Sequence, residues 1–112
     1  MLISMLYSKL RLATVTDSSF KYHGSIGIDE DIMDALGIIE YQVVNVNSIS
    51  GDLRTQTYAI PEERGSGAIV ARGALSNFLI KGDQCHINVY CQMTRGEANE
   101  HKPIIIETNE AR

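Results

Sequence analysis

The sequence contains few of the residues that cross-link, stiffen or anchor a chain. Its 112 residues include no tryptophan, two prolines and two cysteines, and the formal net charge is −4. A negative chain without a basic stripe excludes a surface built for nucleic-acid phosphates. The longest apolar runs, such as PIIIE, are far too short to cross a bilayer, and in the N-terminal MLISMLYSKLRL the basic residues follow the apolar stretch, unlike in a secretion signal. We therefore expect a cytoplasmic protein with neither a membrane nor a nucleic acid as partner.

The two cysteines, Cys85 and Cys91, lie in the alternating segment DQCHINVYCQM. On a strand both would point to one face at a separation of roughly 20 Å. A disulfide tolerates a Cα separation of only about 7 Å, so the two cannot pair within this strand. Their alternation with Ile87 and Val89 predicts that they are buried as small hydrophobic side chains. With so few cysteines and only three scattered histidines, no metal cluster at ligand spacing is visible, and we expect no metal.

Short strands dominate the predicted structure, and the chain length suggests a single domain over residues 1–112. Alternation and β-branched residues predict strands over residues 2–7, 11–16, 42–48, 53–60, 68–71, 84–92 and 103–108. Short helices are predicted over residues 29–36, 74–80 and 95–100. The first has acidic residues at its start and Gly37 as its stop, and the third has a capping box of Thr94 and Glu97. Gly51-Asp52 is expected to form a hairpin turn. This pattern favours a mainly β, closed or nearly closed barrel with short crossover helices.

The pair Gly24-Ser25 separates the strand-like segment LATVTDSSFKYH from the first predicted helix. Glycine before serine is typical of a turn, because glycine accepts a positive φ and the hydroxyl can bond nearby amides. No G-x-S-x-G elbow surrounds Ser25, so conventional hydrolase chemistry is not indicated. A second chemistry stays open, in which the serine hydroxyl attacks the carbonyl carbon of Gly24. Elimination of the resulting ester would cut the chain and leave a pyruvoyl group, whose ketone can react with an amine and accept electrons.

The segment RTQTY places Arg54, Gln56 and Tyr58 on one face of a strand, and its two threonines on the other. An arginine and a tyrosine two positions apart could both reach a small dianionic ligand, since the planar guanidinium donates two parallel hydrogen bonds to a carboxylate. Taken alone, Lys9 and Arg54 are more typical of solvated surface charges, and Tyr58 of a barrel aromatic.

Several segments together resemble the pyruvoyl-dependent aspartate 1-decarboxylase family, namely SKLRLATVT, YHGSIGIDEDIMDALGI, VVNVNSISGDLRTQTYAI, RGALSNFLIKGD and HKP. The resemblance runs in one register from Met5-Leu6 to Lys102-Pro103. It implies a six-stranded double-psi β-barrel, assembled as a homotetramer with sites between neighbouring subunits. It also implies self-cleavage between Gly24 and Ser25 into chains 1–24 and 25–112, and a covalent pyruvoyl cofactor. The implied activity is decarboxylation of L-aspartate to β-alanine and carbon dioxide, which feeds pantothenate and coenzyme A biosynthesis.

The resemblance also implies roles for individual residues. Ser25 would be the processing nucleophile and the residue that becomes the pyruvoyl group. Lys9 and Arg54 would hold the carboxylates of the substrate. Thr57 would support the processing intermediate and contact the substrate, and Tyr58 would donate a proton after carbon dioxide leaves. Tyr22 would belong to the pocket wall, together with the backbone of Gly73-Ala74, which would contact the substrate.

Two positions near the Gly73-Ala74 backbone depart from the family pattern. Arg72 stands where the family has an asparagine, and its donor-only guanidinium could clamp a carboxylate, fill the pocket or turn to solvent. His86 stands at a usually aliphatic position, where a hydrogen-bonded wall residue is a more common role than an acid or base. These departures leave two alternatives open: a noncatalytic barrel oligomer that binds an acidic metabolite or a protein, and a pyruvoyl enzyme acting on another amino acid. A maturation partner is neither indicated nor excluded by the sequence.

Overall fold

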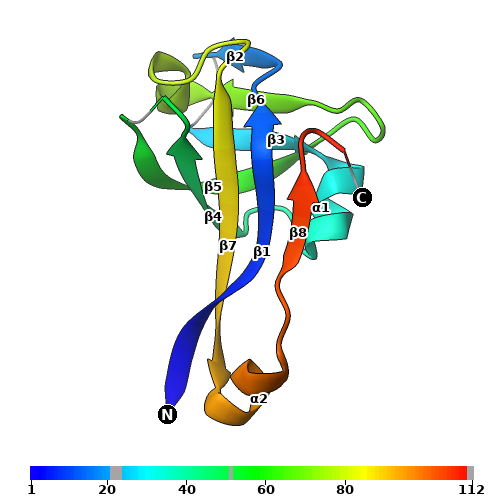
Figure 1. The fold of residues 1–112 in the computed structure, drawn as a ribbon. Coiled ribbons are helices and arrows are strands. Elements are labelled where there is room, and N and C mark those ends of the chain that lie inside the picture. Colours follow the sequence, from blue (N-terminus) through cyan, green and yellow to red (C-terminus); the bar gives the residue numbers. More distant parts are fainter. Residues whose placement is uncertain (21–23, 51, 111–112) are drawn as a thin grey trace.

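One continuous sheet of eight strands makes up most of the molecule in a computed structural model, which describes residues 1–20, 24–50 and 52–110 (Figure 1). The strands are β1 (Leu2–Thr14), β2 (Asp17–Ser19), β3 (Ser25–Asp29), β4 (Val43–Ser48), β5 (Arg54–Glu62), β6 (Ile69–Arg72), β7 (Gln84–Thr94) and β8 (Ile104–Glu107). The helices are α1 (Glu30–Leu36), the 3₁₀ helix η1 (Gly73–Asn77) and α2 (Arg95–Glu100). The strand order is β2-β6-β3-β5-β4-β7-β1-β8, so the short strands β2 and β8 form the two edges. The mainly β, barrel-like fold is confirmed.

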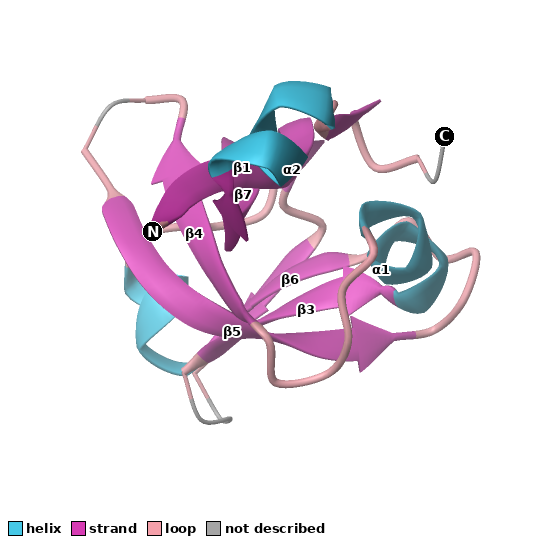
Figure 2. Cartoon of the chain, turned by 90° about the horizontal axis from the view of Figure 1, so that it is seen from below, coloured by secondary structure: helices cyan, strands magenta, loops and turns pink. Residues whose placement is uncertain are grey.

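Helices cover parts of this sheet at different ends. α1 packs against β3 and β5, whereas α2 packs against the far ends of β1 and β7 (Figure 2). Among the described residues, no helix is both long enough and apolar enough to cross a membrane.

β1 is one long strand, and the prediction of separate strands over residues 2–7 and 11–16 is wrong. It pairs with β7 in antiparallel register, and the two extend together beyond the rest of the sheet toward α2 (Figure 1). The register shifts between Leu6 and Ser8 and again between Leu10 and Ala13. Such bulges bend a strand without ending it, so the polar residues between the two predicted strands stay within the sheet.

Each of these irregularities in β1 is contacted by a histidine. The Nε2 atom of His101 lies 3.0 Å from the carbonyl oxygen of Leu6. The backbone amide of Leu12, whose φ is 57°, donates to Nδ1 of His86 at 3.1 Å. Backbone groups that leave the ladder at a bulge thereby gain side-chain partners.

The core lies on the face of the sheet that carries the alternating apolar residues of β7. Cys85, Ile87 and Val89 are buried there, as the alternation predicts. Cys91, which pairs with Met5 near the start of β1, is only partly buried, so the prediction of burial holds fully for Cys85 alone. Both cysteines are free thiols, and burial followed by the negative charge of Asp83 raises the pKa of Cys85 to about 12.

β3 is a buried strand where the sequence indicated only a turn before a helix. All its residues from Ser25 to Asp29 are buried, and it pairs in parallel with β5 and in antiparallel with β6. The helix that follows is confirmed: the carboxylate of Asp29 accepts from the amide of Asp31, and α1 stops at Gly37, whose φ is 73°. In β3 the apolar Ile26 and Ile28 alternate with Ser25, Gly27 and Asp29, but the strand is only five residues long, so the alternation is too short to separate it from a turn.

The remaining predicted elements differ from the structure mainly at their ends. The other predicted strands are present within about two residues, and the capping box of Thr94 and Glu97 opens α2. The predicted helix over residues 74–80 is the shorter 3₁₀ helix η1. In the predicted turn at Gly51-Asp52, Gly51 lies outside the described residues.

The C-terminal segment is tied to the sheet in two ways. β8 pairs in parallel with β1. Beyond β8, the side-chain amide of Asn109 donates to the carbonyls of Thr14 and Gly67, and its oxygen accepts from the amide of Thr14 at 2.7 Å. Asn109 thus bonds both backbone groups of Thr14, as a residue of a neighbouring strand would.

Candidate active site

The bond between Gly24 and Ser25 lies at the start of β3, where a hydroxyl from β5 reaches it. Oγ1 of Thr57 donates to the carbonyl oxygen of Gly24 at 3.4 Å. Ser25 is buried, with 2% of its surface exposed. A Cβ on Gly24 would lie 3.9 Å from the amide nitrogen of Ala74, so the backbone at the start of η1 packs closely against the bond. The hydroxyl of Thr57 is therefore placed to stabilise negative charge on the Gly24 oxygen.

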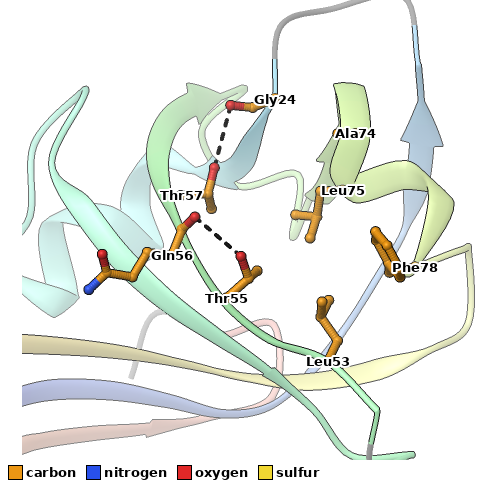
Figure 3. Close-up of a pocket in the computed structure, with 8 residues that line it drawn as sticks. All are labelled: Gly24, Leu53, Thr55, Gln56, Thr57, Ala74, Leu75 and Phe78. Atoms are coloured by element: carbon orange, nitrogen blue, oxygen red, sulfur yellow. Dashed lines mark hydrogen bonds between the residues drawn. The ribbon is translucent and has the colours of Figure 1, made fainter.

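A small cavity of about 200 Å³ opens beside this bond (Figure 3). Its lining is Gly24, Leu53, Thr55, Gln56, Thr57, Ala74, Leu75 and Phe78. The apolar side chains point into it, whereas the amide of Gln56 points away (Figure 3). The cavity is smaller than the ~300–1,000 Å³ that is typical of pockets for drug-sized ligands, so it suits a ligand of few atoms.

Gly73 shapes the backbone at this cavity. It is buried and has a φ of 61°, a conformation that residues with a side chain rarely adopt. It turns the chain from β6 into η1, which brings the amide of Ala74 toward Gly24. Tyr22, the other expected wall residue, lies outside the described residues.

Tyr58 lies on the strand next to Ser25 and on the same face of the sheet. Ile26 pairs with Ala59, and both side chains are buried in the core. The residues that precede them, Ser25 and Tyr58, therefore share the opposite face. The ring of Tyr58 lies 6.0 Å from that of Tyr41.

Arg54 does not line this cavity but a neighbouring polar hollow of about 250 Å³, which shares Thr55 and Gln56 with it. Side chains from three strands line that hollow: Asn45, Asn47, Arg54, Thr55, Gln56 and Tyr90. Lys9 lies on β1, four positions from β3 in the strand order, and lines neither the cavity nor the hollow. Neither cationic side chain forms a hydrogen bond or an ion pair with another described residue. One chain thus brings Gly24, Ser25, Thr57 and Ala74 together, whereas Lys9 and Arg54 do not line the cavity beside them.

Arg72 binds a residue that the sequence analysis did not identify. Its Nη2 and Nε atoms lie 2.6 Å and 3.0 Å from Oε2 of Glu62. Both side chains are largely buried, with 18% and 16% of their surfaces exposed. Arg72 is therefore neither turned to solvent nor part of the cavity lining. Glu62 was missed because Pro61 indicated the end of a strand, whereas β5 continues to Glu62.

His86 faces the bulge of β1. Because its Nδ1 accepts from the amide of Leu12, the ring must be neutral at that atom. Burial, and then the positive charges of Lys9 and Arg11, hold the pKa of His86 below its ordinary value. This arrangement fits a wall residue that positions β1. Within the described part of the chain, no group of histidine, cysteine or acidic side chains could hold a metal ion.

Comparison with known proteins gives matches along the whole chain. A family model described as aspartate decarboxylase matches residues 1–112. The chain is 42% identical over 104 residues to an aspartate 1-decarboxylase of Ruminiclostridium cellulolyticum, covering 93% of this chain and 81% of that protein. It is 44% identical over 106 residues to one of Caldicellulosiruptor saccharolyticus, covering 95% and 83%. It is 42% identical over 110 residues to one of Clostridium kluyveri, covering 98% and 87%.

Proposed function

The chain belongs to the aspartate decarboxylase family, and we propose that it removes the α-carboxyl group of L-aspartate by means of a pyruvoyl group made from its own Ser25. The products are β-alanine and carbon dioxide, and β-alanine feeds pantothenate and coenzyme A biosynthesis. The observation that carries the proposal is the hydrogen bond of 3.4 Å from the hydroxyl of Thr57 to the carbonyl of Gly24, next to the buried Ser25.

Maturation is an intramolecular reaction of the chain. Oγ of Ser25 attacks the carbonyl carbon of Gly24, Thr57 stabilises the oxyanion, and the C–N bond breaks as an ester forms. Elimination then releases Gly24 as a carboxylate and leaves dehydroalanine, which takes up water, loses ammonia and becomes the pyruvoyl group. The single domain would become two chains, residues 1–24 and 25–112. Since Gly24 lines the cavity, its departure would open the buried position 25 to a ligand.

In the decarboxylation, the pyruvoyl carbonyl supplies the sink for the electrons that carbon dioxide leaves behind. Arg54 and Lys9 would bind the two carboxylates of aspartate and orient it. Tyr58, on the same sheet face as position 25, would deliver a proton to the former α-carbon. Because the guanidinium of Arg72 is bound to Glu62, it does not act as a third cationic group for the substrate. This supports aspartate over a substrate that would need such a group.

A homotetramer would complete this site, because within one chain neither Arg54 nor Lys9 lines the cavity. Large apolar side chains lie exposed around the site, which is typical of a surface that another subunit covers. Phe78, on the cavity lining, is 63% exposed, and Tyr41, beside Tyr58, is 67% exposed. The free thiols of Cys85 and Cys91 fit a cytoplasmic location, where thiols stay reduced.

Intact mass measurement of the purified protein tests the proposal. Cleavage should replace the 12.4 kDa chain with two fragments, and the larger should carry a carbonyl group that borohydride or hydrazine traps. Ser25→Ala should stay uncut and folded. Cut protein should release carbon dioxide from L-aspartate faster than from L-glutamate. Folded protein that stays uncut after prolonged warming, with no carbonyl to trap, would contradict the proposal.

A further inference from the structure

The ion pair of Arg72 and Glu62 spans β3, the strand that begins with Ser25. Arg72 is the last residue of β6 and pairs with Ser25, at the first position of β3. Glu62 is the last residue of β5 and pairs with Asp29, at the other end of β3. The two side chains therefore reach toward each other from opposite ends and opposite sides of β3.

They meet over Gly27, in the middle of β3. A Cβ on Gly27 would overlap the carboxylate of Glu62, so the pair occupies the space that any larger residue would fill. Gly27 is not among the glycines with positive φ, and a side chain is excluded here by the carboxylate rather than by the backbone. Arg72 and Glu62 can therefore pair across β3 only because position 27 has no side chain.

The pair formed by Ser25 and Arg72 ends the ladder between β3 and β6, directly next to the Gly24–Ser25 bond. The end of a ladder opens more easily than its middle, so the position of Ser25 depends on what holds Arg72. A partly buried guanidinium without its carboxylate partner would be costly and would seek other acceptors.

We propose that Glu62 is a positioning residue for self-cleavage: by binding Arg72 across Gly27, it holds the end of β6 against Ser25. This inference rests on the proposed cleavage at Gly24–Ser25. It assigns Arg72 a role in positioning the backbone rather than in binding the substrate. The attack of Oγ on the carbonyl carbon requires close alignment, and a displacement of about 1 Å can lower such a rate by about 100-fold.

The first test compares Glu62→Gln with Glu62→Asp by following the uncut fraction over time with intact mass. Glutamine keeps the size of the side chain but removes its charge, whereas aspartate keeps the charge and is shorter. A role through Arg72 predicts that Glu62→Gln is cut at least about 10-fold more slowly than the unaltered chain, and that Glu62→Asp is cut faster than Glu62→Gln. A role in packing alone predicts the reverse order. Glu63→Gln is the matched control, because Glu63 is exposed and forms no ion pair with a described residue.

The second test uses Gly27→Ala, whose new methyl group should displace the carboxylate of Glu62. It should slow cleavage about as much as Glu62→Gln. Because both changes break the same ion pair, the double variant should be within about twofold of the slower single variant, whereas independent effects would multiply. Thermal unfolding checks that each variant is folded. If Glu62→Gln does not fold, the cleavage rates of Gly27→Ala and Glu62→Asp are compared instead.

The outcomes separate this inference from the proposed function. If the unaltered chain is never cut, the proposed function fails and this inference fails with it. If the unaltered chain is cut and Glu62→Gln is cut within about twofold of its rate, only the role of Glu62 is overturned. Faster cleavage of Glu62→Gln than of Glu62→Asp, or multiplicative effects with Gly27→Ala, would overturn it equally.

Discussion

Replacing Thr57 with valine tests the hydrogen bond on which the proposed self-cleavage depends. Valine has the shape of threonine but lacks the hydroxyl that donates to the carbonyl of Gly24. The negative charge that develops on this oxygen during attack by Ser25 would then lose a donor. The native fold should persist, because one neutral hydrogen bond contributes only about 1 kcal/mol to stability.

The expected loss follows from the geometry of this bond. Removing one donor of an oxyanion site lowers a rate by about 100- to 1,000-fold when the donor lies at about 2.7–3.1 Å. The hydroxyl of Thr57 lies at 3.4 Å, so it has to approach as charge develops, and part of its benefit is lost. We expect Thr57→Val to be cut about 10- to 100-fold more slowly, which corresponds to about 1.4–2.7 kcal/mol on the barrier.

The assay is a time course of the uncut fraction by intact mass at constant temperature. Thr55→Val is the matched control, because Thr55 lines the same cavity but donates at 3.4 Å to the carbonyl of Gln56 rather than to Gly24. It should be cut at the rate of the unaltered chain. The reasoning is refuted if both variants are cut equally fast, or if Thr55→Val is the slower one.

Two further predictions concern stability and pH. Burial raises the pKa of Asp29, but the amides of Gly67, Asp31 and Gly65 outweigh it and hold that pKa below its ordinary value. In Asp29→Asn, the side-chain NH₂ group would face a backbone N–H, so two donors would oppose each other. The free energy of unfolding, measured in urea at pH 7, should fall by about 2–3 kcal/mol. An unchanged urea midpoint would contradict this. The pKa of His86 in the folded chain lies below its usual 6.5. The stability that neutral His86 contributes to the fold is therefore complete above pH 6.5 and is lost as the pH falls through the folded pKa. His86→Gln should therefore lose less stability than the unaltered chain between pH 7.5 and pH 5, and parallel losses would count against the bond to Leu12.

Elements with strong local signals could be predicted from the sequence. α1 follows from acidic residues at its start and from Gly37 at its end, and α2 follows from the capping box of Thr94 and Glu97. The core face of β7 follows from alternation. In each case the deciding contacts join residues a few positions apart, or residues that repeat with the period of a strand.

Features that depend on distant pairing could not be predicted from the residues. β3 alternates over only five residues, and its polar face is buried by its place between β5 and β6, which no local pattern shows. The partner of Arg72 is ten positions away and is reached only across Gly27, so no local pattern marks Glu62. The position of Lys9 on β1, four strands from β3, likewise follows from the strand order, which hydrophobic periodicity does not determine.

The place of β1 inside the sheet has a consequence for the molecule after it is cut. β1 lies between β7 and β8, and β2 pairs with β6, so the short fragment would stay bound through ladders on several strands although no covalent bond retains it. Renaturation of the uncut chain can begin within one molecule, whereas a denatured, cut molecule has to find a separate fragment in solution. Its recovery should therefore fall on dilution more steeply than that of Ser25→Ala, so a chain that folds before it is cut assembles more readily than one cut beforehand.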